Sequence, residues 1–143
     1  PERAGGVPNG ELVRLCYSGK YTEKEMIKQL VGKAGFNAYC GSNDARDIEA
    51  MAKNGDKHAQ LVFDAFLYQV SKDIGAQAAV LSGKVDQIIL TGGIAYGKYA
   101  TEEITKRVQF IAPVTVYGGE DELLALAQGA LRVLNGEEEA KVY

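Results

Sequence analysis

Two apolar segments in the second half of the chain each run into a Gly-Gly pair and then a helical pattern. The first, VDQIIL at 85–90, is followed by Thr91-Gly92-Gly93. The second, PVTVYG at 113–118, precedes a helical pattern over 121–134. A helical pattern over 101–110 lies between them, and a long one over 56–81 comes before both. This alternation predicts an α/β fold whose two strands pair in parallel through right-handed crossovers. The continuous apolar run at 85–90 is typical of a central parallel strand.

The first half is predicted to be mainly helical after a Gly- and Pro-rich loop at 1–10. Thr22 and Glu25 have the spacing of a capping box, which places a helix start there. Ser42 or Asp44 is expected to cap another helix. The predicted elements of this half are a short helix from 11 to about 19, a helix from 22 to about 31, a strand at 36–40 (FNAYC) and a helix from 44 to 53.

The helical pattern at 56–81 is apolar over an unusually broad face. Val62, Phe66, Val70, Ile74 and Ala78 recur every four residues, and neighbouring apolar residues widen the stripe: Ala59, Phe63 and Leu67. Such breadth predicts burial on more than one side. Small residues, namely Gly75, Ala76, Ala78 and Ala79, would let another backbone approach closely. We therefore expect this helix to contact a further domain or to contribute to a homodimer or a higher homo-oligomer.

Composition excludes several classes of function. The 143 residues carry a net charge of −3 with no basic stripe, which argues against nucleic acid as the main partner. No apolar run approaches the roughly 20 residues that span a bilayer, so no membrane partner is expected. Cys16 and Cys40 have neither metal nor redox spacing and are interpreted as reduced, partly buried thiols of a cytoplasmic protein. His58 is interpreted as a helix surface residue.

Ligands of parallel sheets bind beyond the carboxyl ends of the strands, where both Gly-Gly pairs lie. At Thr91-Gly92-Gly93 the missing side chains would let a flat or anionic ligand lie against the backbone, although a tight strand-to-helix turn explains the same residues. The segment matches neither a Rossmann fingerprint nor a Walker A motif.

Two charged segments are further candidates. Asp44, Arg46 and Asp47 fall within one helical turn, where they serve as helix caps or place the Arg46 guanidinium against a base or ribose. The GGEDE segment at 118–122 puts three carboxylates at a helix start. They either interact with the helix dipole or provide oxygen ligands for magnesium.

Four segments in this order resemble the C-terminal part of the butyrate kinase branch of the acetate kinase family. They are PERAGG, GSNDARDIEAM, GAQAAVLSGKVDQIILTGGIAY and VYGGEDELLALAQGALRVL. The resemblance covers essentially the whole chain. It implies the fold of the superfamily of actin, sugar kinases and chaperone ATPases: an α/β, ribonuclease H-like domain that is duplicated, with helices packed on a partly parallel sheet. It also implies phosphoryl transfer between ATP and a short-chain carboxylate, giving an acyl phosphate and ADP, with Mg²⁺ as the cofactor.

The resemblance assigns roles to particular residues. Gly92, Gly93 and Ile94 match the loop that lies against adenosine, while Asp44, Ala45 and Arg46 match the other wall of the adenine pocket. Arg3 matches an arginine near the transferred phosphoryl group and is the catalytic candidate. The metal candidates are Asp121 and Glu122, with Glu120 as a neighbour that could substitute. Acetate kinases carry asparagine where this chain has Gly97, so a side-chain contact to nucleotide is not expected there.

Family members are roughly twice as long, in keeping with two duplicated domains. We therefore interpret residues 1–143 as a partial C-terminal nucleotide-binding domain of a two-domain carboxylate kinase, a fragment or a truncated form. Such a piece is expected to hold much of the adenosine site but neither the carboxylate site nor activity. Two other readings stay open: a non-catalytic nucleotide-binding module, and a mainly structural role for 56–81 as a subunit interface.

Overall fold

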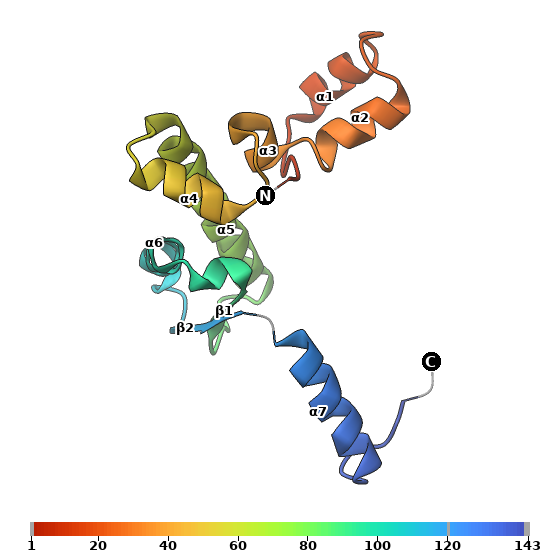
Figure 1. Cartoon of the computed structure of the whole chain (residues 1–143), viewed down its shortest axis with the longest axis vertical. Coiled ribbons are helices and arrows are strands. Elements are labelled where there is room, and N and C mark those ends of the chain that lie inside the picture. Colours follow the sequence, from red (N-terminus) through yellow and green to blue (C-terminus); the bar gives the residue numbers. More distant parts are fainter. Residues whose placement is uncertain (1, 120, 142–143) are drawn as a thin grey trace.

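The computed structural model describes residues 2–119 and 121–141. Helices dominate, and a small parallel sheet lies at one edge of the helical core (Figure 1). In chain order the elements are α1 (Asn9–Cys16), α2 (Glu23–Leu30), α3 (Gly35–Cys40), α4 (Ala45–Lys53), α5 (Lys57–Val80), β1 (Ile88–Gly92), the 3-10 helix η1 (Gly93–Tyr96), α6 (Lys98–Val108), β2 (Val114–Gly118) and α7 (Glu122–Leu134). No helix in the described part of the chain is both long and apolar enough to cross a membrane.

The predicted parallel pairing is confirmed. β1 pairs with β2 in a register that places Ile88 opposite Val114 and Gly92 opposite Gly118. The predicted central position of β1 is wrong for this structure, because within residues 2–119 and 121–141 the sheet contains only these two strands. Ile88 is buried, whereas Ile89 on the opposite face is 59% exposed. One face of the sheet is therefore covered by protein and the other is open.

The core forms where α3, α4, α6 and β1 pack around α5 (Figure 1). On α5 the fully buried ladder is Ala59, Phe63, Leu67 and Ser71, one residue every four. The series that the sequence suggested as the main apolar face, from Val62 to Ile74, lies beside this ladder and is only partly buried. The predicted breadth of the apolar face is confirmed, and α5 is the helix around which the other elements are arranged.

Polar side chains cap α2, α4 and α5, and the caps of α2 and α4 were predicted from the sequence. Thr22 Oγ1 accepts from the Glu25 amide and Glu25 accepts from the Thr22 amide, which completes the capping box. Of the two candidates for the cap of α4, Asp44 performs it, accepting from the Arg46 amide at 2.9 Å. Asp56 caps α5 in the same way. Each cap satisfies amides that have no partner within their own helix.

The strand predicted at 36–40 is wrong, because this segment forms α3. Phe36 and Cys40 are four residues apart, so a helix turns both toward α5, where Phe36 is 2% exposed. The Phe36 ring lies 4.9 Å from the ring of Phe66, measured between centroids. Gly41 ends the helix in the left-handed conformation, with φ of 74°. Burial against α5 has overridden the alternating pattern of a short segment.

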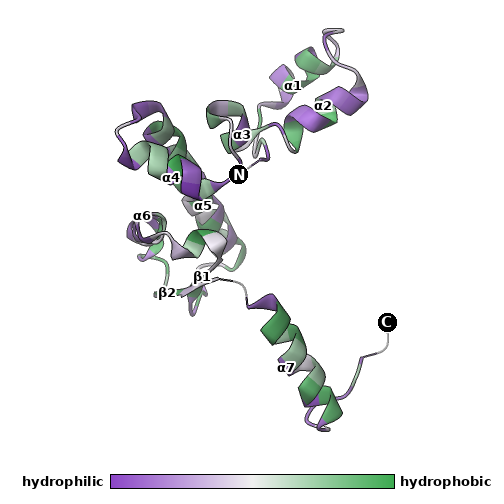
Figure 2. Cartoon of the chain, in the orientation of Figure 1, coloured by the Kyte–Doolittle hydropathy of each residue, from purple (hydrophilic) through white to green (hydrophobic). Residues whose placement is uncertain are grey.

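Two parts of the molecule lie away from this core. α1 and α2 form a separate arm near the N-terminus, and α7 extends from the end of β2 (Figure 1). Hydrophobic residues run along much of α7 (Figure 2), and its leucines are exposed, Leu123 to 84%. Cys16, at the end of α1, is also exposed rather than partly buried, so the prediction for that thiol is wrong. His58 lies on the surface at the start of α5, as predicted.

Candidate functional site

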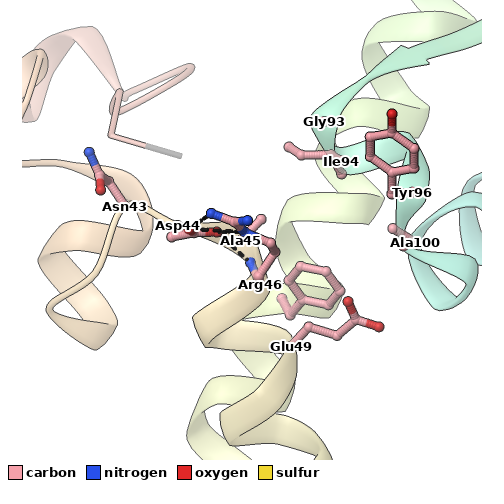
Figure 3. Close-up of a pocket in the computed structure, with 11 residues that line it drawn as sticks. Asn43, Asp44, Ala45, Arg46, Glu49, Gly93, Ile94, Tyr96 and Ala100 are labelled. Carbon is pink, nitrogen blue, oxygen red and sulfur yellow. Dashed lines mark hydrogen bonds and ion pairs between the residues drawn. The ribbon is translucent and has the colours of Figure 1, made fainter. Parts of the chain in front are cut away.

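A cleft opens between the N-terminal end of α4 and the segment formed by η1 and the start of α6 (Figure 3). Its volume is about 790 Å³, within the range of about 300–1,000 Å³ that is usual for small-molecule sites. The two walls come from segments about fifty residues apart in the sequence. The lining residues are Asn43, Asp44, Ala45, Arg46, Glu49, Phe63, Gly93, Ile94, Tyr96, Gly97 and Ala100.

Packing on α5 brings the two walls together. Ile48 of α4 and Ala100 of α6 are both buried in the cluster that contains Phe63 of α5. Phe63 itself reaches the cleft and supplies an apolar surface at its base. Its ring stacks on that of Tyr99, with centroids 6.2 Å apart and planes 23° apart. The distance between the walls is therefore set by the hydrophobic core.

The wall on α4 presents a charged pair at its end. The Arg46 guanidinium donates to both Asp44 carboxylate oxygens, with Nε at 3.0 and 3.1 Å and an Nη atom at 2.5 Å. These side-chain hydrogen bonds, with the bond from the Arg46 amide, lower the pKa of Asp44 to about 2. Asp44 is therefore ionised at neutral pH and holds the Arg46 guanidinium beside its own carboxylate. The Arg46 side chain is still 88% exposed and available to a ligand.

Hydrogen bonds order the loop before α4. Ser42 Oγ donates to Asp47 at 2.6 Å and accepts from the Asp44 amide at 3.1 Å. Asn43, which lines the cleft, donates to Glu2 at 3.2 Å. This contact brings the N-terminal segment to one end of the cleft.

Arg3 lies on that N-terminal segment but is not among the lining residues. Its backbone pairs with Val31 in an antiparallel bridge, and the flanking residues Glu2 and Ala4 bond to the backbone at 30–32. The Arg3 side chain is exposed. The structure thus places Arg3 one residue from a contact with the cleft, and its predicted catalytic role stays a prediction.

The wall on η1 is bare at Gly93. A Cβ atom built on Gly93 meets nothing within 4 Å, so the space beside this backbone is open. Gly97 is more confined, because a Cβ there would lie 3.2 Å from the Ile94 carbonyl oxygen and 3.4 Å from Glu49. Glu49 pairs with Lys53 at 2.8 Å and its side chain is only 16% exposed. A carboxylate therefore occupies the space next to Gly97.

The two Gly-Gly turns meet, as predicted for neighbouring strand ends. Gly92 and Gly119 exchange backbone hydrogen bonds of 3.2 and 3.1 Å, and Thr91 Oγ1 donates to the Gly119 carbonyl. Gly92 has φ of 87°, a conformation that suits glycine. It lies in the strand end behind the cleft, whereas Gly93 and Ile94 line the cleft itself.

The acidic turn after β2 is only partly described. Glu120 lies outside the described residues. Asp121 and Glu122 are exposed at the start of α7, and neither is a lining residue of the cleft. Across the described ranges, no group of three or more His, Cys, Asp or Glu side chains is arranged to hold a metal ion. Metal binding by Glu120, Asp121 and Glu122 therefore stays a prediction.

Comparison with known proteins identifies the family. The sequence profile of the acetokinase family matches residues 2–140. The chain belongs to this family. It is 62% identical over all 143 residues to butyrate kinase 2 of Clostridium acetobutylicum, and 56% identical to a probable butyrate kinase of Clostridium botulinum. The chain spans about 40% of the length of each of these relatives.

Solved structures of the family confirm the predicted fold class. An acetate kinase from Porphyromonas gingivalis superimposes with a TM-score of 0.80 at 25% identity, over 93% of this chain and 40% of that one. An acetate kinase from Entamoeba histolytica does so with a TM-score of 0.76 at 19% identity, over 91% of this chain and 41% of that one, and this likeness supports the fold alone. The chain thus has the α/β fold of these kinases, with helices packed on a parallel sheet.

Sequence reasoning found the two main segments of the cleft but not all of its lining. Five of the six predicted nucleotide-binding residues line it: Asp44, Ala45, Arg46, Gly93 and Ile94. It missed Glu49, although this residue lies one turn after Ala45 on α4, a spacing that puts both on one side of a helix. It also missed Phe63, which was interpreted as part of the apolar face of the helix at 56–81, and Tyr96, to which no role was given.

Proposed function

We propose that this chain supplies the nucleotide-binding part of a carboxylate kinase. The enzyme would transfer the γ-phosphoryl group of ATP reversibly to butyrate, or to a related short-chain carboxylate, giving butyryl phosphate and ADP. We further propose that residues 1–143 form part of the C-terminal domain of a two-domain enzyme that acts in the cytoplasm as a homodimer or higher homo-oligomer. The identity to butyrate kinases over the whole chain supports the choice of butyrate.

The observation that carries the nucleotide assignment is the cleft itself. The bottom of the cleft is apolar at Phe63, one wall presents bare backbone at Gly93, and the other presents the exposed guanidinium of Arg46. These three features suit a nucleotide, because its nucleobase is flat and apolar on both faces while its ribose and phosphates carry polar oxygens. The guanidinium can stack on the base or donate to oxygen atoms.

Phosphoryl transfer also requires positive charge near the transferred group and a divalent cation. Arg3 carries positive charge on a segment that reaches the cleft through Glu2 and Asn43, and a guanidinium there would stabilise charge on the transferring phosphoryl group. Nucleotide-dependent kinases of this family would use ATP with Mg²⁺. In residues 2–119 and 121–141 no group of three or more His, Cys, Asp or Glu side chains is arranged to hold a metal ion, and Glu120, Asp121 and Glu122 remain the proposed ligands.

A non-catalytic nucleotide-binding or oligomerisation module is the alternative. Such a module would need the cleft and the broad face of α5, but it would need neither Arg3 nor the acidic turn at 120–122. Turnover by the complete gene product that is lost in an Arg3 variant still able to bind ADP would favour the enzyme. ADP binding without any turnover in the parent protein would favour the module.

The test of the nucleotide site is Gly93→Val. The backbone of Gly93 does not have a positive φ, and a Cβ there meets nothing within 4 Å, so the fold should tolerate the change. The branched side chain would fill space beside the η1 wall that we assign to adenosine. We expect calorimetry on the complete gene product to show ADP binding weakened about tenfold or more, which equals about 1.4 kcal/mol.

A matched control is Gly10→Val on α1, which is also open and far from the cleft. It should leave ADP affinity unchanged. If Gly93→Val remains folded and binds ADP as tightly as the parent protein, the nucleotide does not lie against this wall.

A further inference from the structure

Tyr96 is an exposed aromatic residue in the lining of the cleft. It ends η1 and is 73% exposed, although large aromatic side chains usually bury much of their surface. Figure 3 shows it across the cleft from Arg46, on the side of Gly93 and Ile94. No residue of α4 covers it. A large, flat and mostly exposed ring therefore borders the space assigned to the nucleotide.

The second Gly-Gly turn provides the place where this ring rests. A Cβ at Gly118 would lie 2.9 Å from Tyr96 Cδ1, which is too close for a real contact, and 3.2 Å from Cε1, which is tight. A Cβ at Gly119 would collide with the Tyr96 hydroxyl and lie 2.8 Å from Cζ. The absence of side chains at 118 and 119 thus lets the ring lie against the end of β2. The ring accounts for glycine at 118, whereas at Gly119 the positive φ of 100° already favours glycine.

Backbone hydrogen bonds hold that place firmly. Gly119 is bonded to Gly92 in both directions, and Gly92 immediately precedes η1. The support beneath Tyr96 and the segment that carries Tyr96 therefore belong to one hydrogen-bonded unit. A ring positioned in this way loses little conformational freedom when a ligand packs on it, which favours binding.

We propose that Tyr96 is a nucleobase-stacking residue, held in place by Gly118 and Gly119, and that the base lies between its ring and the Arg46 wall. This inference rests on the proposed nucleotide site and deepens it. Stacking uses the π-face that every base has, so Tyr96 would contribute affinity for the base and not for the phosphates. Aromatic residues that stack on a base contribute on the order of tenfold or more in affinity.

The first experiment compares Tyr96→Phe and Tyr96→Leu in the complete gene product, with ADP and inorganic pyrophosphate as ligands. Phenylalanine keeps the ring, so ADP affinity should stay within about twofold of the parent value. Leucine keeps apolar bulk but removes the π-face, so ADP should bind about tenfold more weakly. Pyrophosphate affinity should not change in either variant. Tyr17→Leu, at an exposed tyrosine beyond α1, is the matched control.

The second experiment moves the ring without altering it. Gly118 has no positive φ, so alanine is allowed by the backbone, yet its Cβ would force the Tyr96 ring to shift. Gly118→Ala should therefore weaken ADP binding in the parent protein and have no further effect in a Tyr96→Leu background. Non-additivity of this kind is the signature of two residues that act together.

The outcomes separate this inference from the proposed function. If the parent protein binds ADP no better than pyrophosphate, the nucleoside site itself is wrong. If the parent protein binds ADP well but Tyr96→Leu binds it equally well, only the stacking role is overturned. Equal weakening of ADP and pyrophosphate in Tyr96→Leu would overturn it too, because that result indicates a general distortion of the cleft. A selective tenfold loss for ADP with rescue by phenylalanine supports it.

Discussion

The hydroxyl group of Tyr99 ties α6, which follows the η1 wall of the cleft, to α5. It donates to Asp64 Oδ1 at 2.7 Å. Gln60 Nε2 donates to the same carboxylate oxygen at 2.9 Å and to the Tyr99 oxygen at 3.1 Å. Tyr99→Phe would remove the hydroxyl group while keeping the ring that stacks on Phe63. The substitution therefore isolates the hydrogen bonds from the packing.

The expected cost follows from these contacts. A hydrogen bond to a charged acceptor contributes about 1.5–3 kcal/mol to stability, and one between neutral groups about 1 kcal/mol. Asp64 keeps its bond from Gln60, and both Asp64 and Tyr99 are only partly buried, so water can replace part of what is lost. We expect the free energy of unfolding to fall by about 1–2 kcal/mol. For a domain of this size, that lowers the melting temperature by about 3–7 °C.

The same contact has a pH signature. The pKa of Tyr99 is raised, first because its hydroxyl group donates to Asp64, and further because of burial and the nearby carboxylates of Asp64 and Glu103. A tyrosine whose pKa is higher in the folded state contributes its full stabilisation below its unfolded pKa of about 10 and loses it as the pH rises through the folded value. The stability difference between the parent protein and Tyr99→Phe should be constant near neutral pH and shrink above about pH 10.

Urea unfolding at a series of pH values measures both effects. Tyr68→Phe, at an exposed tyrosine on the same helix as Asp64, is the control and should change stability little. Equal stability of Tyr99→Phe and the parent protein at pH 7 would refute the role given to this network. So would a difference that does not diminish at alkaline pH.

Three further predictions concern the site and the assembly. Arg3→Ala in the complete gene product should lower turnover on the order of 100-fold while leaving ADP affinity nearly unchanged; near-normal turnover in a kinetic assay would remove the catalytic assignment. The carboxyl group of Asp44 should titrate near pH 2 by NMR and return toward about 3.9 in Arg46→Ala, so an equally low value in that variant would contradict the stated cause. Light scattering on the complete gene product should show a dimer or larger oligomer, in which we expect Lys57–Val80 to contribute to the interface. A purely monomeric protein would exclude that interface.

Long elements could be predicted from the sequence because their patterns are redundant. α5 extends over 24 residues, and many apolar positions agree on one helical face. α3 has only six residues, and five of them alternate in a way that equally suits a strand. The i to i+4 relation of Phe36 and Cys40 was present in the sequence, but only the position of α5 shows that both must turn the same way. Short segments are therefore decided by their surroundings.

Some residues of the candidate site could be predicted from the sequence and others could not. Segments with unusual local chemistry, such as Gly92-Gly93 and Asp44-Ala45-Arg46, could be selected from sequence. Phe63 could not, because a phenylalanine on a broad apolar helix is most simply a core residue, and here it serves both the core and the cleft. The role of Gly118 and Gly119 could not be predicted either, because it depends on the ring of Tyr96, which lies more than twenty residues earlier in the chain.

The extended position of α7 has a consequence for its hydrogen exchange. A helix of 13 residues is only marginally stable in water without packing, because the cost of starting it is spread over few hydrogen bonds. In the described structure its leucines, such as Leu126 at 65% exposure, bury too little surface to add much. The hydrogens of its backbone amides should therefore exchange with solvent much faster than those of α5, unless another surface covers the apolar face of α7. The exchange rate of α7 is thus a direct report on whether that face is covered in solution.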